Sequence, residues 1–221
     1  MADGPPTDVA APGGPYATTF KRWIDLVLSI LLVVFLMPLM ACIWVAVRIA
    51  LGRPSLHVDE RSGRNGWPIR VLKFRSMSDA RGPDGLLLPD AERLESFGRF
   101  LRRTSLDELP QLFNVLAGDM SLVGPRPLPL RYVPRYSRRQ ASRLLVRPGL
   151  TGWAQIHGRN DLDWPARLEL DARYVEMLSR GYAPLADLWI ITATAFHAAW
   201  QAVTGRGVSA PGSATMREFS P

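Results

Sequence analysis

Two adjacent acids, Asp107 and Glu108, stand in the densest cluster of chemically useful residues in the chain, which runs from Arg102 to Pro110. Ser105 and Glu108 are three residues apart before an apolar run, so they also fit a capping box in which Glu108 only caps a helix. Pro110 disturbs the first turn of such a helix. Paired carboxylates on an irregular turn can bind Mg²⁺, and a carboxylate can attack phosphorus.

Several cations could face this pair of acids. Lys73 and Arg75 are two residues apart at the end of a predicted strand, so they point to the same side. Arg102 precedes the acids by about one helical turn, and Arg126 is held between two prolines. Arginine suits bidentate phosphate contacts, whereas lysine acts as a point charge. Each of these side chains could equally be a solvated surface cation, and only their convergence would favour binding of a polyanion.

The composition narrows the class of partner. The 221 residues carry a net charge of +7, and 25 of the 27 basic residues are arginines. This excess favours an anionic partner. The single cysteine excludes an internal disulfide framework and a thiolate zinc cluster, and the wide separation of the three histidines argues against a His-rich metal site. The sequence has no Gly-rich phosphate-binding motif and no recognisable nucleic-acid reader, so we expect no nucleic-acid partner.

A long apolar run, residues 26–47, contains no charged side chain. As a straight helix it would reach about 33 Å, which is enough to cross a hydrocarbon core of about 30 Å. Pro38 predicts a kink within it. Basic residues flank the run on both sides, and the positive-inside rule then favours a helix that enters and leaves the membrane on the same face. A single-pass, proline-kinked helix is the alternative.

The remaining elements predict a mainly α-helical protein with a small β-hairpin. The hairpin strands are expected at residues 56–58 and 68–74, on either side of Asn65-Gly66. Amphipathic helices are expected at residues 91–103, 105–116, 137–145, 164–180 and 185–203, with Asp163 as a cap, a short strand at 120–123 and a loop-rich segment at 147–160. The predicted organisation is a disordered tail (1–19), a re-entrant membrane segment (20–52), a catalytic domain (53–204) and a flexible tail (205–221).

Taken in order, these segments resemble the bacterial sugar transferases, the small monotopic polyprenyl-phosphate phosphoglycosyltransferases. The resemblance covers about residues 20–200. It is carried by Lys21-Arg22-x-x-Asp25, Lys73-Phe74-Arg75-Ser76-Met77, the long motif from Arg102 to Asp119, Val123-Gly124-Pro125-Arg126-Pro127, and Arg147-Pro148-Gly149-Leu150-Thr151-Gly152-Trp153-Ala154-Gln155. The chain departs from the family pattern at Met37, where Ser usually precedes the proline, and at Asp59, where Gln is common.

The resemblance implies a re-entrant membrane helix-break-helix, interfacial amphipathic helices and a cytosolic catalytic domain on the bacterial inner membrane. It implies transfer of a sugar 1-phosphate from a UDP-sugar to undecaprenyl phosphate, with release of UMP. Asp107 would be the nucleophile, and Asp107 and Glu108 would bind Mg²⁺. The substrate-binding residues would be Lys73, Arg75, Arg102, Arg126 and Arg147. The further partners implied are inner-membrane lipid and downstream glycosyltransferases, in a pathway that assembles a membrane-linked glycan.

Two other functions fit the same residues. A metal-dependent phosphohydrolase could use the two acids on lipid or nucleotide pyrophosphates, and it would turn over without a polyprenyl phosphate. A membrane-anchored basic adaptor would show no metal-dependent turnover. The identity of the sugar cannot be read from the sequence: the segment from His157 to Asn160 is a candidate for donor contacts, and an ordinary surface loop fits it as well.

Overall fold

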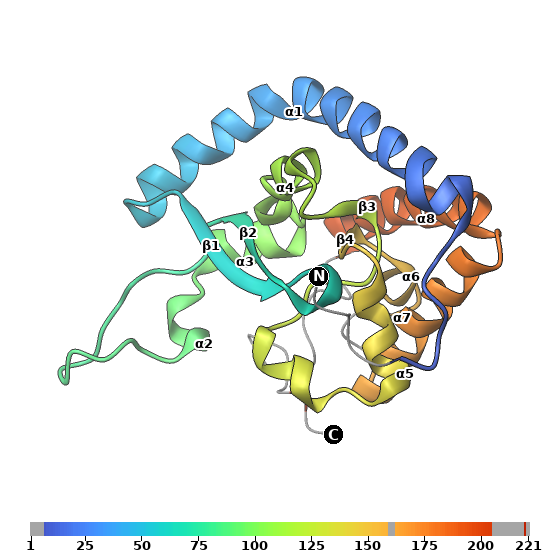
Figure 1. Cartoon of the computed structure of the whole chain (residues 1–221). Helices are drawn as coiled ribbons and strands as arrows, with labels where there is room; N and C mark the ends of the chain where they lie inside the picture. The colour runs from blue at the N-terminus through green and yellow to red at the C-terminus, as the bar shows by residue number, and fades with distance from the viewer. Residues whose placement is uncertain (1–6, 159–161, 205–218, 220–221) are drawn as a thin grey trace.

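The computed structural model describes residues 7–158, 162–204 and 219 of the chain. Its most prominent element is α1 (Lys21–Leu51), which follows a π-helical turn at Tyr16–Phe20. Helical structure continues through Pro38, so the predicted break is absent. The helix instead bends, because proline removes one backbone hydrogen bond without ending the helix. Figure 1 shows it as an arch over the rest of the molecule.

Polar contacts fix the N-terminal end of α1 to three other elements. Lys21 donates to Asp187 of α8 (Ala183–Thr204) at 2.6 Å. Arg22 donates to the carbonyls of Val115 and Leu116, in the last turn of α4 (Gln111–Ala117), at 2.6 and 3.0 Å. The backbone N–H of Leu122 donates to Asp25 at 3.0 Å. The Lys21-Arg22-x-x-Asp25 pattern therefore anchors the helix to the domain beneath it.

The segment before α1 is also placed against the domain. Val9 is buried, Ser179 donates to the carbonyl of Ala10 at 3.0 Å, and Tyr16 donates to Asp187 at 2.8 Å. Residues 7–19, expected as part of a disordered tail, are ordered by these contacts. Residues 1–6 lie outside the described residues, as does the predicted tail at 205–221 apart from Phe219.

The predicted hairpin is confirmed. Strands β1 (Leu56–Ser62) and β2 (Pro68–Phe74) pair antiparallel, and His57 lies directly opposite Lys73. Asn65 and Gly66 both have positive φ, at 57° and 79°, in the turn that the sequence marked. Because side chains alternate along a strand, the odd-numbered residues of β1 share the face that carries Lys73.

The helices before and around the two acids differ from the expected pattern. The helix expected at 91–103 is two helices, α2 (Asp90–Arg93) and α3 (Ser96–Arg103). The helix expected at 105–116 begins with Ser105 in the left-handed region at φ 56°, followed by a 3₁₀ turn (Leu106–Glu108) and then α4 (Gln111–Ala117). Gly118, at φ 95°, ends α4 as the sequence indicated.

The C-terminal half adds a short parallel sheet and, in its described residues, five helical segments besides α8. Strand β3 (Ser121–Val123) pairs with β4 (Gly149–Thr151), which lies in the segment expected to be loop, as does α6 (Trp153–Ile156). A 3₁₀ segment (Leu130–Arg135), α5 (Arg138–Ala141) and a second 3₁₀ segment (Ser142–Leu145) precede β4. Helix α7 (Trp164–Ser179) is capped by Asp163, as predicted, with the Ala166 N–H donating at 2.9 Å.

Three glycines, Gly124, Gly149 and Gly152, allow the segment around Gly124-Pro125-Arg126 to contact the segment from Arg147 to Gln155. A Cβ on Gly149 would lie 2.1 Å from the backbone nitrogen of Gly124, and a Cβ on Gly152 would lie 2.1 Å from the Gly124 carbonyl oxygen. Real Cβ atoms do not approach a backbone so closely. The glycines of the Gly124-Pro125-Arg126 and Arg147-to-Gln155 segments are therefore required by direct backbone contact.

Two apolar clusters hold both halves of α1 to the same body. The larger joins Val33 of α1 to buried residues of β2, α4, β3, α7 and α8. The smaller joins Met40, Ile43 and Val47 of α1 to Phe74 and Leu101. Other side chains of α1 are exposed and apolar, among them Trp23, Leu31, Val34, Phe35 and Ile49, and α8 exposes Leu185, Leu188, Trp189 and Phe196. By length and composition, the Tyr16–Leu51 helix is long and apolar enough to cross a membrane.

Gly98 sets how closely α3 approaches the end of β2, and its substitution tests that packing. A Cβ at this position would lie 1.8 Å from the Ser76 carbonyl oxygen. We expect Gly98→Ala to destabilise the fold by about 1–3 kcal/mol despite the higher helix propensity of alanine. Thermal unfolding would measure this. Gly13→Ala is the control, because nothing lies within 4 Å of its Cβ position, and equal stability of the two variants would contradict the packing argument.

Candidate active site

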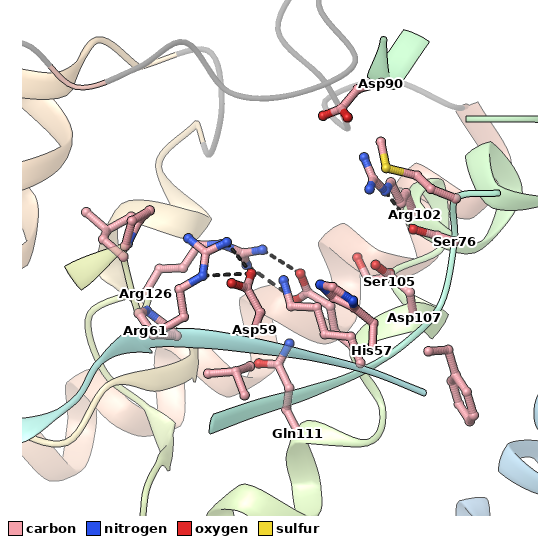
Figure 2. Close-up of a pocket in the computed structure, with 18 of the residues that line it drawn as sticks. His57, Asp59, Arg61, Ser76, Asp90, Arg102, Ser105, Asp107, Gln111 and Arg126 are labelled. Carbon is pink, nitrogen blue, oxygen red and sulfur yellow. Dashed lines mark hydrogen bonds and ion pairs between the residues drawn. The ribbon is translucent and has the colours of Figure 1, made fainter. Parts of the chain in front are cut away.

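A cavity of about 750 Å³ lies between the β1–β2 hairpin, the 3₁₀ turn of the two acids and α7. Its lining includes Lys73, Arg75, Arg102, Asp107, Glu108 and Arg126, so six of the seven candidate site residues converge there. In Figure 2, Asp107, Ser105 and His57 lie on one side of the view, and Arg61 and Arg126 lie across from them. The cations therefore converge on the two acids, and this convergence favours binding of a polyanion over scattered surface arginines.

Glu108 is held by Arg126 and does not cap a helix. Both terminal nitrogens of Arg126 donate to the Glu108 carboxylate, one of them at 3.3 Å. The Ser105 side chain does not cap the turn, since Ser105 has a left-handed backbone. The predicted capping box is therefore not formed. The left-handed residue and the following 3₁₀ turn instead direct both acids toward the cavity.

Asp107 is only 7% exposed. Burial is the main cause that raises its pKa to about 7, and the neighbouring negative charge of Glu108 adds to the effect. The positive charges of Lys73, Arg102 and Arg126 oppose that rise. Burial lowers the pKa of Lys73, and the positive charges of Arg126 and Arg61 lower it further. The site thus places a buried carboxyl and a buried amine together, each pushed toward its neutral form by desolvation.

Hydrogen bonds and ion pairs fix the arginine side chains around Asp107. Arg102 donates from Nε to the Ser76 hydroxyl at 2.9 Å. Behind Arg126, the buried Arg143 donates to the Arg126 carbonyl at 2.5 Å and forms an ion pair with Asp171 at 3.0 Å. The negative charge of Glu108 raises the pKa of Arg126. These contacts hold the guanidinium groups in place before any ligand arrives, which lowers the entropy cost of binding.

Arg75 lines the cavity but already has three protein partners. It donates to the carbonyls of Met77 and Arg53 at 2.9 and 2.8 Å and pairs with Asp79 at 3.1 Å. Arg147, the seventh candidate, lies apart from the cavity lining. Its Nε donates to the Gly118 carbonyl at 2.8 Å, at the end of α4. The structure thus brings Arg147 to a helix terminus, where a cation is favourable, and does not bring it to the two acids.

Sequence reasoning missed several residues that line the cavity. Arg61 and Asp59 lie on the same face of β1 as His57, and Asp59 accepts hydrogen bonds from Arg61. Arg131 and Arg167 also line it. The predicted strand at 56–58 ended too early to include Asp59 and Arg61, which alternate with His57 along the observed β1 (Leu56–Ser62). On α7, the spacing of Trp164, Arg167 and Asp171 at i, i+3 and i+7 marks one helix face.

The candidate donor segment from His157 to Asn160 is described only in part, because residues 159–161 lie outside the described residues. His157 Nδ1 lies 2.8 Å from the Trp153 carbonyl oxygen, and its ring packs on Trp153 with centroids 4.4 Å apart. The His157 ring is thus engaged with α6.

The donor set suits Mg²⁺ better than a transition metal. Two adjacent carboxylates, Asp107 and Glu108, face a cavity large enough for phosphate groups and water. Among the residues that the structure describes, no group of three or more His, Cys, Asp or Glu side chains could form a closed metal site. Mg²⁺ commonly binds through one or two carboxylates and completes its shell with water and substrate phosphates. The residues present therefore fit this ion.

Comparison with known proteins identifies the relatives of the chain. The profile of the family described as "Bacterial sugar transferase" matches residues 16–201. The sugar transferase EpsL of Bacillus subtilis is 47% identical over 71% of this chain and 77% of its own length. An undecaprenyl-phosphate galactose phosphotransferase of Salmonella typhimurium is 40% identical over 71% of this chain and 36% of its own. A UDP-glucose:undecaprenyl-phosphate glucose-1-phosphate transferase of Escherichia coli is 38% identical over 80% and 39%, respectively. The chain thus spans well under half the length of these last two relatives.

The raised pKa of Asp107 predicts a gain in stability when the charge is removed. The folded state binds this proton more tightly than the unfolded state, so folding stability is lost as pH rises from about 4 toward about 7. Asn remains neutral throughout. We expect Asp107→Asn to raise the melting temperature in metal-free buffer at pH 8 and to have little effect at pH 4. Asp119→Asn, at an exposed acid, controls for loss of one negative charge. A difference that does not grow with pH would contradict the assignment.

Proposed function

The chain belongs to the bacterial sugar transferase family, and we propose that it transfers a sugar 1-phosphate from a UDP-sugar to undecaprenyl phosphate, releasing UMP. Sugar-phosphate transfer is the reaction named for its relatives, so the enzyme class follows from the family. The observation that carries the proposal is a pair of acids, Asp107 and Glu108, facing clustered cations in one cavity of a chain that also carries a long apolar helix. A diphosphate donor needs the cations, and a lipid acceptor needs the apolar surface.

In this proposal the reaction has two steps. The Asp107 carboxylate attacks the phosphorus that bears the sugar, the bond to the bridging oxygen breaks, and UMP leaves with the electron pair. A phosphate oxygen of undecaprenyl phosphate then attacks the same phosphorus, which releases the carboxylate and forms the lipid diphosphate sugar. The covalent intermediate lets a soluble donor and a lipid acceptor use one site in turn. Arg126 and Lys73 neutralise charge on the phosphoryl oxygens.

Asp107 and Glu108 would also hold Mg²⁺, which when bound supplies charge neutralisation at the diphosphate. Arg126 also holds Glu108 in an ion pair. Glu108 would keep this ion pair while its carboxylate contributes to Mg²⁺ binding. Lys73 and Arg102 offset the negative charge of Asp107. Their positive charges favour the ionised carboxylate, which is the nucleophilic form, against the desolvation that favours the neutral acid.

The proposed membrane arrangement is re-entrant, with the body on the cytoplasmic face of the bacterial inner membrane. Its support is that both ends of α1 contact the same body: Lys21 and Arg22 at one end, and Ile43 and Val47 at the other. A helix crossing the bilayer would place its ends on opposite sides. The exposed apolar residues of α1 and α8 would then lie in the leaflet. The lipid-linked product would serve downstream glycosyltransferases that assemble a membrane-linked glycan.

Loss of the nucleophile should abolish turnover. We expect Asp107→Asn to release no UMP from any UDP-sugar in detergent with undecaprenyl phosphate and Mg²⁺, and to accumulate no sugar-phosphate adduct detectable by intact-protein mass spectrometry. EDTA should likewise stop the wild type. Arg64→Gln, a change on the hairpin turn outside the cavity lining, is the control and should retain activity.

The acceptor distinguishes transfer from hydrolysis. A transferase makes a lipid diphosphate sugar and turns over repeatedly only with undecaprenyl phosphate. A phosphohydrolase would release UMP continuously without the lipid, and that result, or full activity of Asp107→Asn, would refute the mechanism. A panel of UDP-sugars in the same assay would identify the sugar.

The re-entrant arrangement predicts that both flanks of α1 face the cytoplasm. Single cysteines from Gly13→Cys and Glu60→Cys, in a Cys42→Ala background, place probes at exposed positions before and after the helix. A membrane-impermeant maleimide should label neither site in intact spheroplasts and both after lysis. Labelling of one site alone in intact spheroplasts would indicate a single-pass helix.

A further inference from the structure

One polar side chain in the cavity wall has no role in the chemistry described above. Gln155 of α6 lines the cavity and is only 8% exposed. Its amide nitrogen and its amide oxygen are both buried, and neither has a hydrogen-bond partner within the described part of the chain. An unsatisfied buried amide is costly, so a side chain that keeps both its donor and its acceptor unpaired points to a missing ligand.

The surroundings of Gln155 keep it from finding a protein partner. Its Oε1 lies 2.8 Å from the position that a Cβ on Gly152 would occupy, which indicates tight packing at the start of α6. Helix α6 packs against α7, whose Trp164, Arg167 and Asp171 also line the cavity. Arg167 lies over the Trp164 ring at 5.0 Å, and Tyr132 meets that ring edge-on with centroids 5.6 Å apart.

We propose that Gln155 recognises the imide edge of the uracil base, so that α6 and the cavity face of α7 form the nucleobase subsite of the donor. This inference rests on the proposed function, which makes a uridine nucleotide the donor. A carboxamide presents one donor and one acceptor side by side, and the N3–H and adjacent carbonyl of uracil present the complementary pair. Trp164, which also lines the cavity, belongs to α7, the helix packed against α6.

The sugar fits this position less well. In the proposed reaction the sugar-bearing phosphorus must reach Asp107, which lies on the 3₁₀ turn among Lys73, Arg102 and Arg126. Gln155 instead belongs to α6, whose packing partners are α7 and α8. The base is the part of the donor farthest from the sugar along the diphosphate. It therefore suits a wall of the cavity built by elements other than the turn of the two acids.

Nucleotide binding to the full-length protein in detergent tests the subsite directly. We expect Gln155→Leu to weaken UMP binding, measured by isothermal titration calorimetry, by roughly tenfold or more, because a buried base would lose both hydrogen bonds. Ribose 5-phosphate, which lacks the base, should bind both proteins equally. The wild type should also discriminate UMP from N3-methyl-UMP, and Gln155→Leu should lose that discrimination.

A matched substitution separates recognition from structural support. Gln140 forms a capping box with Ser137 on α5, away from the cavity lining. Gln140→Leu makes the same chemical change at a satisfied amide, so it should lower the melting temperature and leave UMP affinity unchanged. Gln155→Leu should show the opposite pattern, since replacing an unpaired buried amide by an apolar side chain does not cost stability.

The possible failures can be told apart. If the wild type turns over a UDP-sugar and binds UMP, yet Gln155→Leu leaves UMP affinity and the N3-methyl discrimination unchanged, the subsite is refuted and the proposed function stands. If Gln155→Leu raises only the KM for one UDP-sugar relative to others, with UMP affinity intact, Gln155 contacts the sugar and the nucleobase assignment is wrong. If the wild type binds no uridine nucleotide, the proposed donor itself fails.

Discussion

Two adjacent carboxylates in a partly desolvated site repel each other unless cations or a bound proton offset their charge, and this constraint governs the architecture around Asp107 and Glu108. The left-handed Ser105 and the 3₁₀ turn after it prevent the acids from serving as helix caps and direct them to the cavity. Arg126 takes Glu108 in a two-nitrogen ion pair. Asp107 remains the less compensated acid, and its pKa is accordingly raised to about 7. Stability is thus reduced at the residue that we propose as the nucleophile.

The elements that supply the cations meet through backbone contacts that exclude side chains. Gly98 lets α3 press on the Ser76 carbonyl, which brings Arg102 within 2.9 Å of the Ser76 hydroxyl. Gly149 and Gly152 let the second motif segment touch Gly124, next to Pro125 and Arg126. Arg143 then holds the Arg126 carbonyl from behind. These glycines lie at the contacts between elements, and they thereby fix the positions of the guanidinium groups.

The features of the fold that depend on short-range interactions were predicted from the sequence. The Asn65-Gly66 turn specified the hairpin, and Asp163 specified the start of α7. The pair of acids and most of their cations were found because residue type alone restricts their chemistry. Features that depend on tertiary docking were not predictable: the division of residues 91–103 into α2 and α3, the position of Arg147 at the end of α4, and the arrival of Arg167 and Gln155 at the cavity. Pro38 predicted a kink and the re-entrant arrangement implied a break; the helix continues through Pro38, and both halves of the bent α1 pack on one body.

The bend of α1 also bears on how two substrates of unlike solubility could meet. The arched helix is anchored at Lys21 and Arg22 and packs near its other end on Phe74, the residue after Lys73. One face of α1 is therefore buried against the domain while the other exposes Leu31, Val34 and Phe35. An exposed apolar surface of this kind is suited to contact with lipid. Strand β2 places Lys73 in the cavity lining and the next residue, Phe74, at the contact with α1. The cavity and the apolar helix are thus joined by adjacent residues, which is the arrangement that the proposed reaction between a nucleotide donor and a lipid acceptor requires.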